Sequence, residues 1–143
     1  MAQDHIAILS APAVRTALRQ AWEDSLPGIA GGHEEGGFIL QDSVGNLSVA
    51  RWPKGAQTSI LLPLHSQGRV GEADIIATFH THPNTGSDFL QEPGETDQRA
   101  VRDDPDLKGD RYTGEFVISQ SRLYFITPVG QVTDLGAREA RLG

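Results

Sequence analysis

The fold of this chain depends on one stretch, residues 73–83, which reads Ala73-Asp74-Ile75-Ile76-Ala77-Thr78-Phe79-His80-Thr81-His82-Pro83. Most of its first seven residues are apolar or β-branched, a pattern that predicts a β-strand. Side chains two residues apart on a strand share a face, so His80 and His82 are expected to point in the same direction. Pro83 has no N–H to continue a ladder, so the strand is expected to end there. The stretch therefore predicts two imidazoles side by side at the C-terminal end of a strand.

A carboxylate that could join these two histidines follows on a different predicted element. Pro93-Gly94 predicts the start of a helix that runs from Glu95 to about Val101, with Gly94 as its N-cap. Asp97 then lies in the first turn, where the helix dipole favours a negative charge. Two imidazoles and one carboxylate leave the fourth position of a tetrahedral Zn²⁺ to water, which is the ligand count of a catalytic zinc site. The alternative is a chance His-x-His pair beside an ordinary capping residue.

A hydrolytic zinc site also needs a general base that takes a proton from water, most often a Glu just outside the metal shell. The segment His33-Glu34-Glu35-Gly36-Gly37-Phe38-Ile39-Leu40 places two adjacent glutamates at the start of a second apolar strand. Neighbouring side chains on a strand point to opposite faces, so only one of the two can face the metal. Glu34 and Glu35 are therefore both candidates for the base at this point.

With these residues in place, the chain resembles the JAMM (MPN+) metalloprotease family, whose pattern is a Glu, a long gap, His-x-His, a spacer and Ser-x-x-Asp. The resemblance covers nearly the whole chain. It implies that His80, His82 and Asp97 bind Zn²⁺ and that Glu34 is the base, because Gly37 and the following apolar run fix its register. It also implies an α/β fold of the MPN/JAMM (cytidine-deaminase-like) type, a mixed β-sheet flanked by helices.

The function implied by the resemblance is that of a zinc-dependent metallopeptidase or isopeptidase. Such an enzyme hydrolyses a peptide or isopeptide bond of a protein or peptide substrate. Some members of the family remove ubiquitin-like proteins, which would place an extended Gly-Gly tail in the site. Bacterial members also occur alone or at the ends of polymorphic toxins.

The chain departs from the family pattern at two places. The serine that hydrogen-bonds the developing oxyanion is replaced by Gly94, and the spacer between His82 and Gly94 holds eleven residues, which is longer than in the family. Loss of one oxyanion donor typically lowers turnover by ~10²–10³. Hydroxyls of Ser87 or Thr96, or the Gly94 backbone N–H, are candidates to replace it. The departures favour a second hypothesis, a JAMM-like metal-binding module that recognises a protein partner, for example within a toxin or effector system, without cleaving it.

Composition limits the other classes of function. The 143 residues suit a single domain, 1–143, and the absence of cysteine excludes disulfides, Cys-based zinc sites and the zinc deaminases that need Cys ligands. The formal net charge is −7, and the ten arginines are spread along the chain, so nucleic acid is not expected as a partner.

The sequence also bears on localisation. No apolar run approaches the ~20 residues of a membrane span, so no membrane partner is expected. The run Ile6–Leu9 is too short for a signal peptide and lacks a preceding basic cluster. A cytoplasmic location is the default expectation, and delivery by a dedicated secretion machine would leave no such signal.

The remaining elements are predicted from periodicity and turn residues. A helix is expected to begin at Ser10-Ala11-Pro12, with Ser10 as N-cap, and to end at Pro27-Gly28. Its apolar positions recur at helical spacing, namely Val14, Leu18, Ala21 and Trp22. Besides the two strands above, strands are expected over residues 47–52, 58–64, 114–119 and 122–127, with tight turns at 42–46, 119–121 and 128–131.

Overall fold

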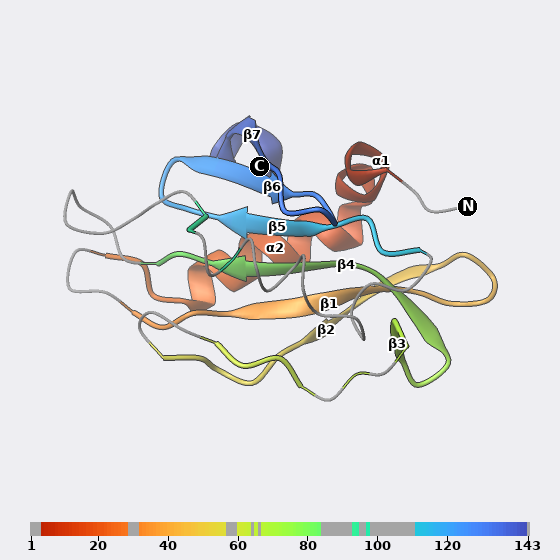
Figure 1. Cartoon of the computed structure of the whole chain (residues 1–143). Coiled ribbons are helices and arrows are strands. Elements are labelled where there is room, and N and C mark those ends of the chain that lie inside the picture. The colour runs from red at the N-terminus through yellow and green to blue at the C-terminus, as the bar shows by residue number, and fades with distance from the viewer. Residues whose placement is uncertain are drawn as a thin grey trace.

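A mixed sheet of seven strands forms the centre of the molecule (Figure 1). The computed structural model describes residues 4–28, 32–56, 60–63, 65, 67–83, 93–94, 97 and 111–142. The strands are β1 (Gly36–Gln41), β2 (Leu47–Arg51), β3 (Arg69–Val70), β4 (Ala73–Thr81), β5 (Glu115–Ile118), β6 (Arg122–Ile126) and β7 (Val132–Ala137). Their order is β2-β1-β4-β5-β6-β7, and β3 also pairs with β4. Among the strands of the described residues, only β4 and β5 run parallel, and the other pairs are antiparallel.

The helices whose bounds lie within the described residues are α1 (His5–Ser10), α2 (Pro12–Asp24) and α4 (Arg138–Leu142). Figure 1 shows α2 crossing the sheet on the far face. This helix contacts α1, α4, β2 and β4. Its predicted apolar stripe is buried in full, which confirms the helical periodicity read from the sequence. The α/β class is therefore confirmed, with a mixed sheet flanked by helices. Within the described residues, no helix combines the length and apolar character needed to cross a membrane.

The two faces of the sheet bury different sets of side chains. The face towards α2 carries Ile39, Phe79 and Phe116, which join the helix residues in the larger core cluster. The opposite face carries the smaller cluster of Phe38, Leu40, Trp52, Ile75, Tyr112, Val117 and Ile126. Alternation along each strand therefore decides which layer a side chain enters.

Several expectations about element boundaries are wrong. Ser10 does not cap the main helix, because it ends the separate short helix α1, which begins after Asp4; the Asp4 carboxylate accepts a hydrogen bond from the Ala7 N–H at 2.8 Å. The N-cap of α2 is Ala11, with Pro12 at the first helical position. The helix ends at Asp24, before Pro27-Gly28.

The expected strand over 58–64 is also wrong in its described part, since residues 60–63 belong to no strand. Ile60 and Leu62 pack on the smaller core cluster while Leu61 is exposed, which gives the alternation of a strand without strand pairing. The hairpin of β1 and β2 and the strands at 73–81, 115–118 and 122–126 are confirmed. The helix predicted from Glu95 to Val101 lies outside the described residues except for Asp97, which is helical.

Two glycines at the start of β1 let neighbouring side chains approach its backbone. A Cβ at Gly36 would lie 2.5 Å from the Trp52 ring and 2.6 Å from the Phe79 carbonyl oxygen. A Cβ at Gly37 would meet the Ala50 carbonyl oxygen and the Phe79 ring, each at 2.8 Å. Neither position has room for a methyl group.

We therefore expect Gly36→Ala to lower the free energy of unfolding by about 1–3 kcal/mol, because the added methyl overpacks the Trp52 contact. Urea unfolding measures this change. Gly28→Ala is the matched control, since a Cβ there meets nothing within 4 Å. Equal midpoints for the two variants would contradict the close packing at Gly36.

Candidate metal centre

Three polar side chains converge at the C-terminal end of β4. The His80 and His82 Nε2 atoms are 3.2 Å apart. Asp97 approaches both, with its Oδ1 3.1 Å from His80 Nε2 and its Oδ2 3.3 Å from His82 Nε2. This group could hold a metal ion, and it is the one such group of three or more His, Cys, Asp or Glu among the described residues.

The spacing of the donor atoms matches the geometry of a shared small cation. Metal–ligand bonds of ~2.0–2.1 Å, directed to the corners of a tetrahedron, place neighbouring donors ~3.3–3.4 Å apart. The separation of the two imidazole nitrogens, 3.2 Å, falls close to this edge length, and one carboxylate oxygen of Asp97 lies at a similar distance from each nitrogen. Two imidazoles and a carboxylate form a donor set that suits Zn²⁺ and other first-row divalent ions.

The two histidines are fixed by the backbone ladder of β4. His80 is 5% exposed and lies between Gly36 of β1 and Val117 of β5. His82 follows the last strand residue, but its N–H still donates to the Ile118 carbonyl oxygen at 2.8 Å. The predicted common direction of the two imidazoles is therefore what the structure shows.

Asp97 is held by the residue that the sequence places at the helix N-cap. The Gly94 N–H donates to Asp97 Oδ2 at 2.8 Å, which is half of a capping box, in which the third helical residue reaches back to the N-cap N–H. Gly94 thus orients the ligand carboxylate through its backbone. Ser87 and Thr96, the other candidates for the oxyanion donor, lie outside the described residues.

The charge of Asp97 is favoured by its neighbours. Burial raises the pKa of the Asp97 carboxyl, but hydrogen bonds from the imidazoles of His80 and His82 outweigh burial and lower this pKa far below its usual range. Asp97 is therefore ionised at any pH at which the histidines can bind a metal.

Glu34 lies on the same face of the sheet as the histidines. It precedes β1 by two residues, so it shares the face of Gly36 and Phe38, and Gly36 pairs with His80. Its backbone is held on the other side by residues 55–56: the Glu34 N–H donates to the Ala56 carbonyl at 2.8 Å, and the Glu34 carbonyl accepts from the Gly55 N–H at 2.9 Å. Glu34 is only 7% exposed.

The electrostatic surroundings of Glu34 are those of the metal centre. Burial is the largest influence and raises the pKa of the Glu34 carboxyl above its usual value of 4.5. The imidazoles of His80 and His82 lower this pKa in part, and the carboxylates of Asp97 and Glu115 raise it. A carboxyl with a raised pKa is suited to accepting a proton and then releasing it.

Glu35, the alternative base, lies on the opposite face. Its carboxylate pairs with Arg51 and with His33, and Arg51 Nη1 in turn lies 3.2 Å from Asp24 Oδ2 at the end of α2. The Glu35 N–H donates to Thr81 Oγ1 at 3.0 Å. The structure thus separates the two glutamates, with Glu34 beside the ligands and Glu35 among charged groups on the helix side.

Sequence reasoning missed Glu115, which contacts the metal centre from the neighbouring strand. Its Oε2 lies 3.0 Å from His80 Nδ1, and Glu115 is 5% exposed. The only signal was an acidic residue at the start of an apolar strand, Glu115-Phe116-Val117-Ile118. Nothing in the sequence indicates that this strand lies beside β4.

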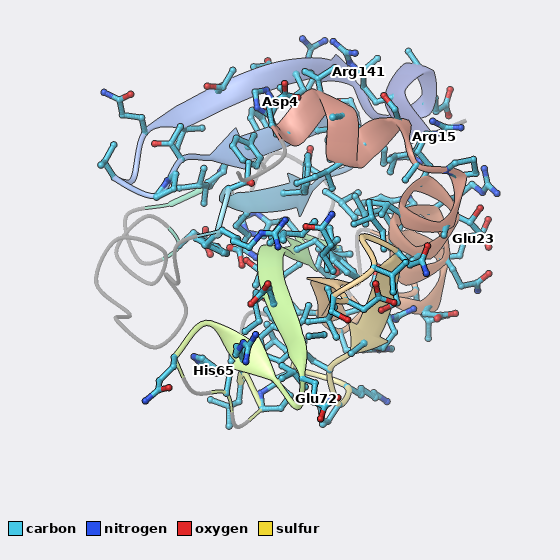
Figure 2. All side chains as sticks on the ribbon, turned by 90° about the vertical axis from the view of Figure 1, so that its right-hand side faces the viewer. Asp4, Arg15, Glu23, His65, Glu72 and Arg141 are labelled. Carbon is cyan, nitrogen blue, oxygen red and sulfur yellow. The ribbon has the colours of Figure 1, made fainter. Side chains whose placement is uncertain are left out.

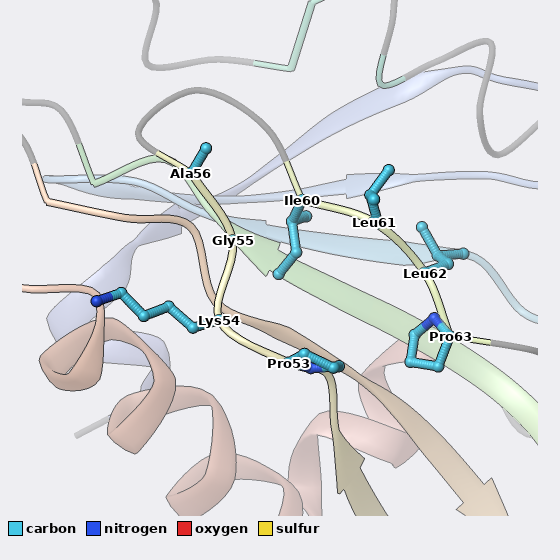
Figure 3. A pocket seen from close by; sticks show the side chains of 8 residues that line it. All are labelled: Pro53, Lys54, Gly55, Ala56, Ile60, Leu61, Leu62 and Pro63. Atoms are coloured by element: carbon cyan, nitrogen blue, oxygen red, sulfur yellow. The ribbon is translucent and has the colours of Figure 1, made fainter.

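A cavity of about 380 Å³ adjoins the segment that pairs with Glu34. Its walls are residues 53–56 and 60–63, and Figure 3 shows Ile60 pointing between these two segments and Lys54 pointing away. The lining is mainly apolar, and Leu61 at its rim is 87% exposed. Trp52 does not line it, because this ring is 3% exposed and packs edge-on against Phe38.

His65 does not join the ligand group. Its ring packs against Phe38, with centroids 5.6 Å apart, and its Nδ1 lies 2.9 Å from the Pro63 carbonyl oxygen. Figure 2 shows His65 on the side of the molecule away from Asp4, Arg15 and Arg141. This imidazole therefore belongs to the packing around the smaller core cluster.

The pH dependence of metal binding should follow the protonation of the His80 imidazole. Burial lowers the pKa of His80, but the carboxylates of Glu115 and Asp97 outweigh burial and raise it well above 6.5. A metal-binding imidazole must be neutral, so a proton competes with the metal at neutral pH. We expect the affinity for Zn²⁺, measured by competition with a chelator, to keep rising as the pH increases above 6.5.

The folding stability of the metal-free protein should fall as the pH rises, whereas its affinity for Zn²⁺ should increase. A histidine whose pKa is raised by folding stabilises the folded state fully below its unfolded pKa of ~6.5, and this stability is lost as the pH rises through the raised value. Thermal unfolding of metal-free wild type should show this decline, and His80→Asn should lack it. The same decline in both proteins would rule out His80 as its source.

Comparison with known proteins does not assign a family. The resemblance to JAMM proteases rests on the motif residues of the sequence alone. No protein-family model, no curated protein and no solved structure matches this chain.

Proposed function

We propose that this protein is a zinc-dependent metallopeptidase or isopeptidase of the JAMM type. The observation that carries the proposal is the position of Glu34 on the same sheet face as His80. All three residues of the ligand group influence the pKa of the Glu34 carboxyl. A metal site that serves only stability needs the ligands alone. A buried carboxyl beside a group of only three ligands, two His and one Asp, is the arrangement used for metal-assisted hydrolysis.

The chemistry divides between the metal and the protein. Zn²⁺ held by His80, His82 and Asp97 would supply a water of lowered pKa and a Lewis acid for the substrate carbonyl. Glu34 accepts a proton from the attacking water and gives it to the leaving amine, so that the amide bond breaks and a carboxylic acid and an amine form. Burial, which raises the pKa of the Glu34 carboxyl in the metal-free protein, favours the protonated form that must hold the proton between these two steps.

The proposed substrate is an extended segment of a protein or peptide, including the Gly-Gly tail of a ubiquitin-like protein. The apolar cavity supports this class, because one of its walls, residues 53–56, is hydrogen-bonded to the backbone of Glu34. An aliphatic side chain a few residues from the cleaved bond would be buried there. The net charge of −7 supports a protein partner over nucleic acid.

The second candidate is a metal-binding module that recognises a protein partner without cleaving it. Gly94 favours it, because the position lacks the serine hydroxyl of the JAMM pattern and its N–H is bonded to Asp97. Glu34 favours the enzyme, because a module that only binds a partner has no use for a base beside the metal.

Metal content is the first test. The purified protein should bind about one Zn²⁺ per chain, and His80→Ala or His82→Ala should remove most of it, because each leaves two of the three donors. Elemental analysis after dialysis against Zn²⁺ measures the content. His65→Ala is the control, since this imidazole lies outside the ligand group and should keep the metal. Absence of zinc uptake by the wild type would refute the proposed centre.

The second test separates the enzyme from the module. Glu34→Gln should keep the fold and the zinc but lower turnover by ~10²–10⁴, because an amide cannot accept the proton. Glu35→Gln is the matched control: it should retain zinc-dependent turnover while lowering the melting temperature, because it breaks the ion pair with Arg51 and alters the contact with His33. Cleavage of ubiquitin-like fusions and of a peptide library measures turnover.

Two outcomes would overturn these assignments. If Glu35→Gln is inactive and Glu34→Gln cleaves like the wild type, the base is Glu35. If the wild type and both variants bind zinc and a partner equally well but cleave nothing, the protein is the binding module.

A further inference from the structure

Glu115 contacts the metal centre from behind the first ligand. It is the first residue of β5 and pairs in register with Thr78 of β4, two residues before His80. Residues two apart on β4 share a face, so the Glu115 side chain lies beside the His80 imidazole. Its Oε2 is 3.0 Å from His80 Nδ1, and both side chains are almost fully buried.

Glu115 cannot bind the same metal ion as His80 Nε2. The two nitrogens of an imidazole point away from each other, and Glu115 approaches Nδ1 while Asp97 and His82 approach Nε2. Its carboxylate is therefore placed to accept a hydrogen bond from Nδ1–H. In the neutral ring that bond leaves the lone pair on Nε2, the nitrogen that faces the other ligands.

The backbone around Glu115 is held on both sides. Gly114, with φ of +142°, lies so close to β6 that a Cβ there would be 2.3 Å from the Ile126 carbonyl oxygen. The Gly114 carbonyl accepts from the Thr78 N–H at 3.0 Å, and the Thr113 N–H donates to the Ile76 carbonyl at 2.7 Å. These contacts fix where β5 begins, and they hold the Glu115 carboxylate at His80.

We propose that Glu115 is a positioning residue that fixes the tautomer and the orientation of His80, so that Nε2 is the metal donor. The inference rests on the proposed metal centre, but the hydrogen bond on which it depends exists without metal. Outer carboxylates on metal-binding histidines typically contribute 10–100-fold to metal affinity.

The experiment measures zinc affinity and the His80 tautomer separately. Affinity is obtained by chelator competition for wild type, Glu115→Ala and Glu115→Gln, with folding checked by circular dichroism. At alkaline pH, where His80 is neutral in every variant and protons no longer compete with zinc, we expect Glu115→Ala to lower the affinity by about 10–100-fold. Glu115→Gln should lose less, because its amide oxygen can still accept from Nδ1–H. Glu139→Gln is the control, since its side chain is 86% exposed and it should bind zinc like the wild type.

The tautomer is read from the imidazole ¹⁵N resonances of metal-free protein at alkaline pH, where the ring is neutral. Wild type and Glu115→Gln should carry the proton on Nδ1, and Glu115→Ala should shift towards a mixture. A wild-type His80 that carries its proton on Nε2 overturns the proposal, whether or not any variant folds. Unchanged zinc affinity in a folded Glu115→Ala variant also overturns it.

These readouts distinguish the two proposals. If the wild type binds no zinc, the proposed metal centre fails, and the tautomer measurement still decides whether Glu115 orients His80. If the wild type binds zinc and Glu115→Ala binds it equally well, the metal centre stands and the positioning role of Glu115 fails.

Discussion

The hydrogen bonds that β4 makes to β1 on one side and to β5 on the other are the constraint on which the site depends. They set the register in which Gly36, His80 and Val117 lie side by side. Because side chains alternate along a strand, this register sends Glu34 and Glu115 to the face of His80 and sends Glu35 to the face of α2. A slip of one residue in β1 would exchange the two glutamates, so that Glu35 would face His80 and Glu34 would face α2.

The charges gathered on this face need a cation. Three carboxylates, those of Glu34, Asp97 and Glu115, lie within or beside the ligand group, and all are mostly buried. With neutral imidazoles the cluster would carry up to three negative charges, and buried charge is unfavourable unless it is paired. Protonation of His80 supplies one positive charge, which is why its pKa is raised. A divalent metal supplies two and leaves both imidazoles free to act as donors.

The sequence predicted the parts of this site that depend on local pattern. The His-x-His pair, its strand and the face shared by the two imidazoles follow from alternation, and Asp97 follows from the chemistry of a helix start. Glu115 could not be predicted, because its contact depends on β5 lying parallel to β4 after more than thirty intervening residues, and no local pattern specifies that pairing. Residues 60–63 show the opposite case, in which a local pattern predicted a strand that is not there. The alternation of their side chains reflects the burial of Ile60 and Leu62 and does not indicate a partner strand.

The contrast between Glu34 and Glu35 bears on whether the centre is catalytic. Glu35 is paired with Arg51 and His33, as expected of a buried carboxylate that supports the structure. Glu34 has two imidazoles beside it, but burial and two nearby carboxylates act against its charge, and the net result is a raised pKa. Such a group lowers the stability of the metal-free protein at neutral pH, so stability alone does not account for it. Groups whose charge is disfavoured in this way concentrate at sites that transfer protons. The two residues that precede β1 thus carry one carboxylate suited to structure and one suited to chemistry, on opposite faces.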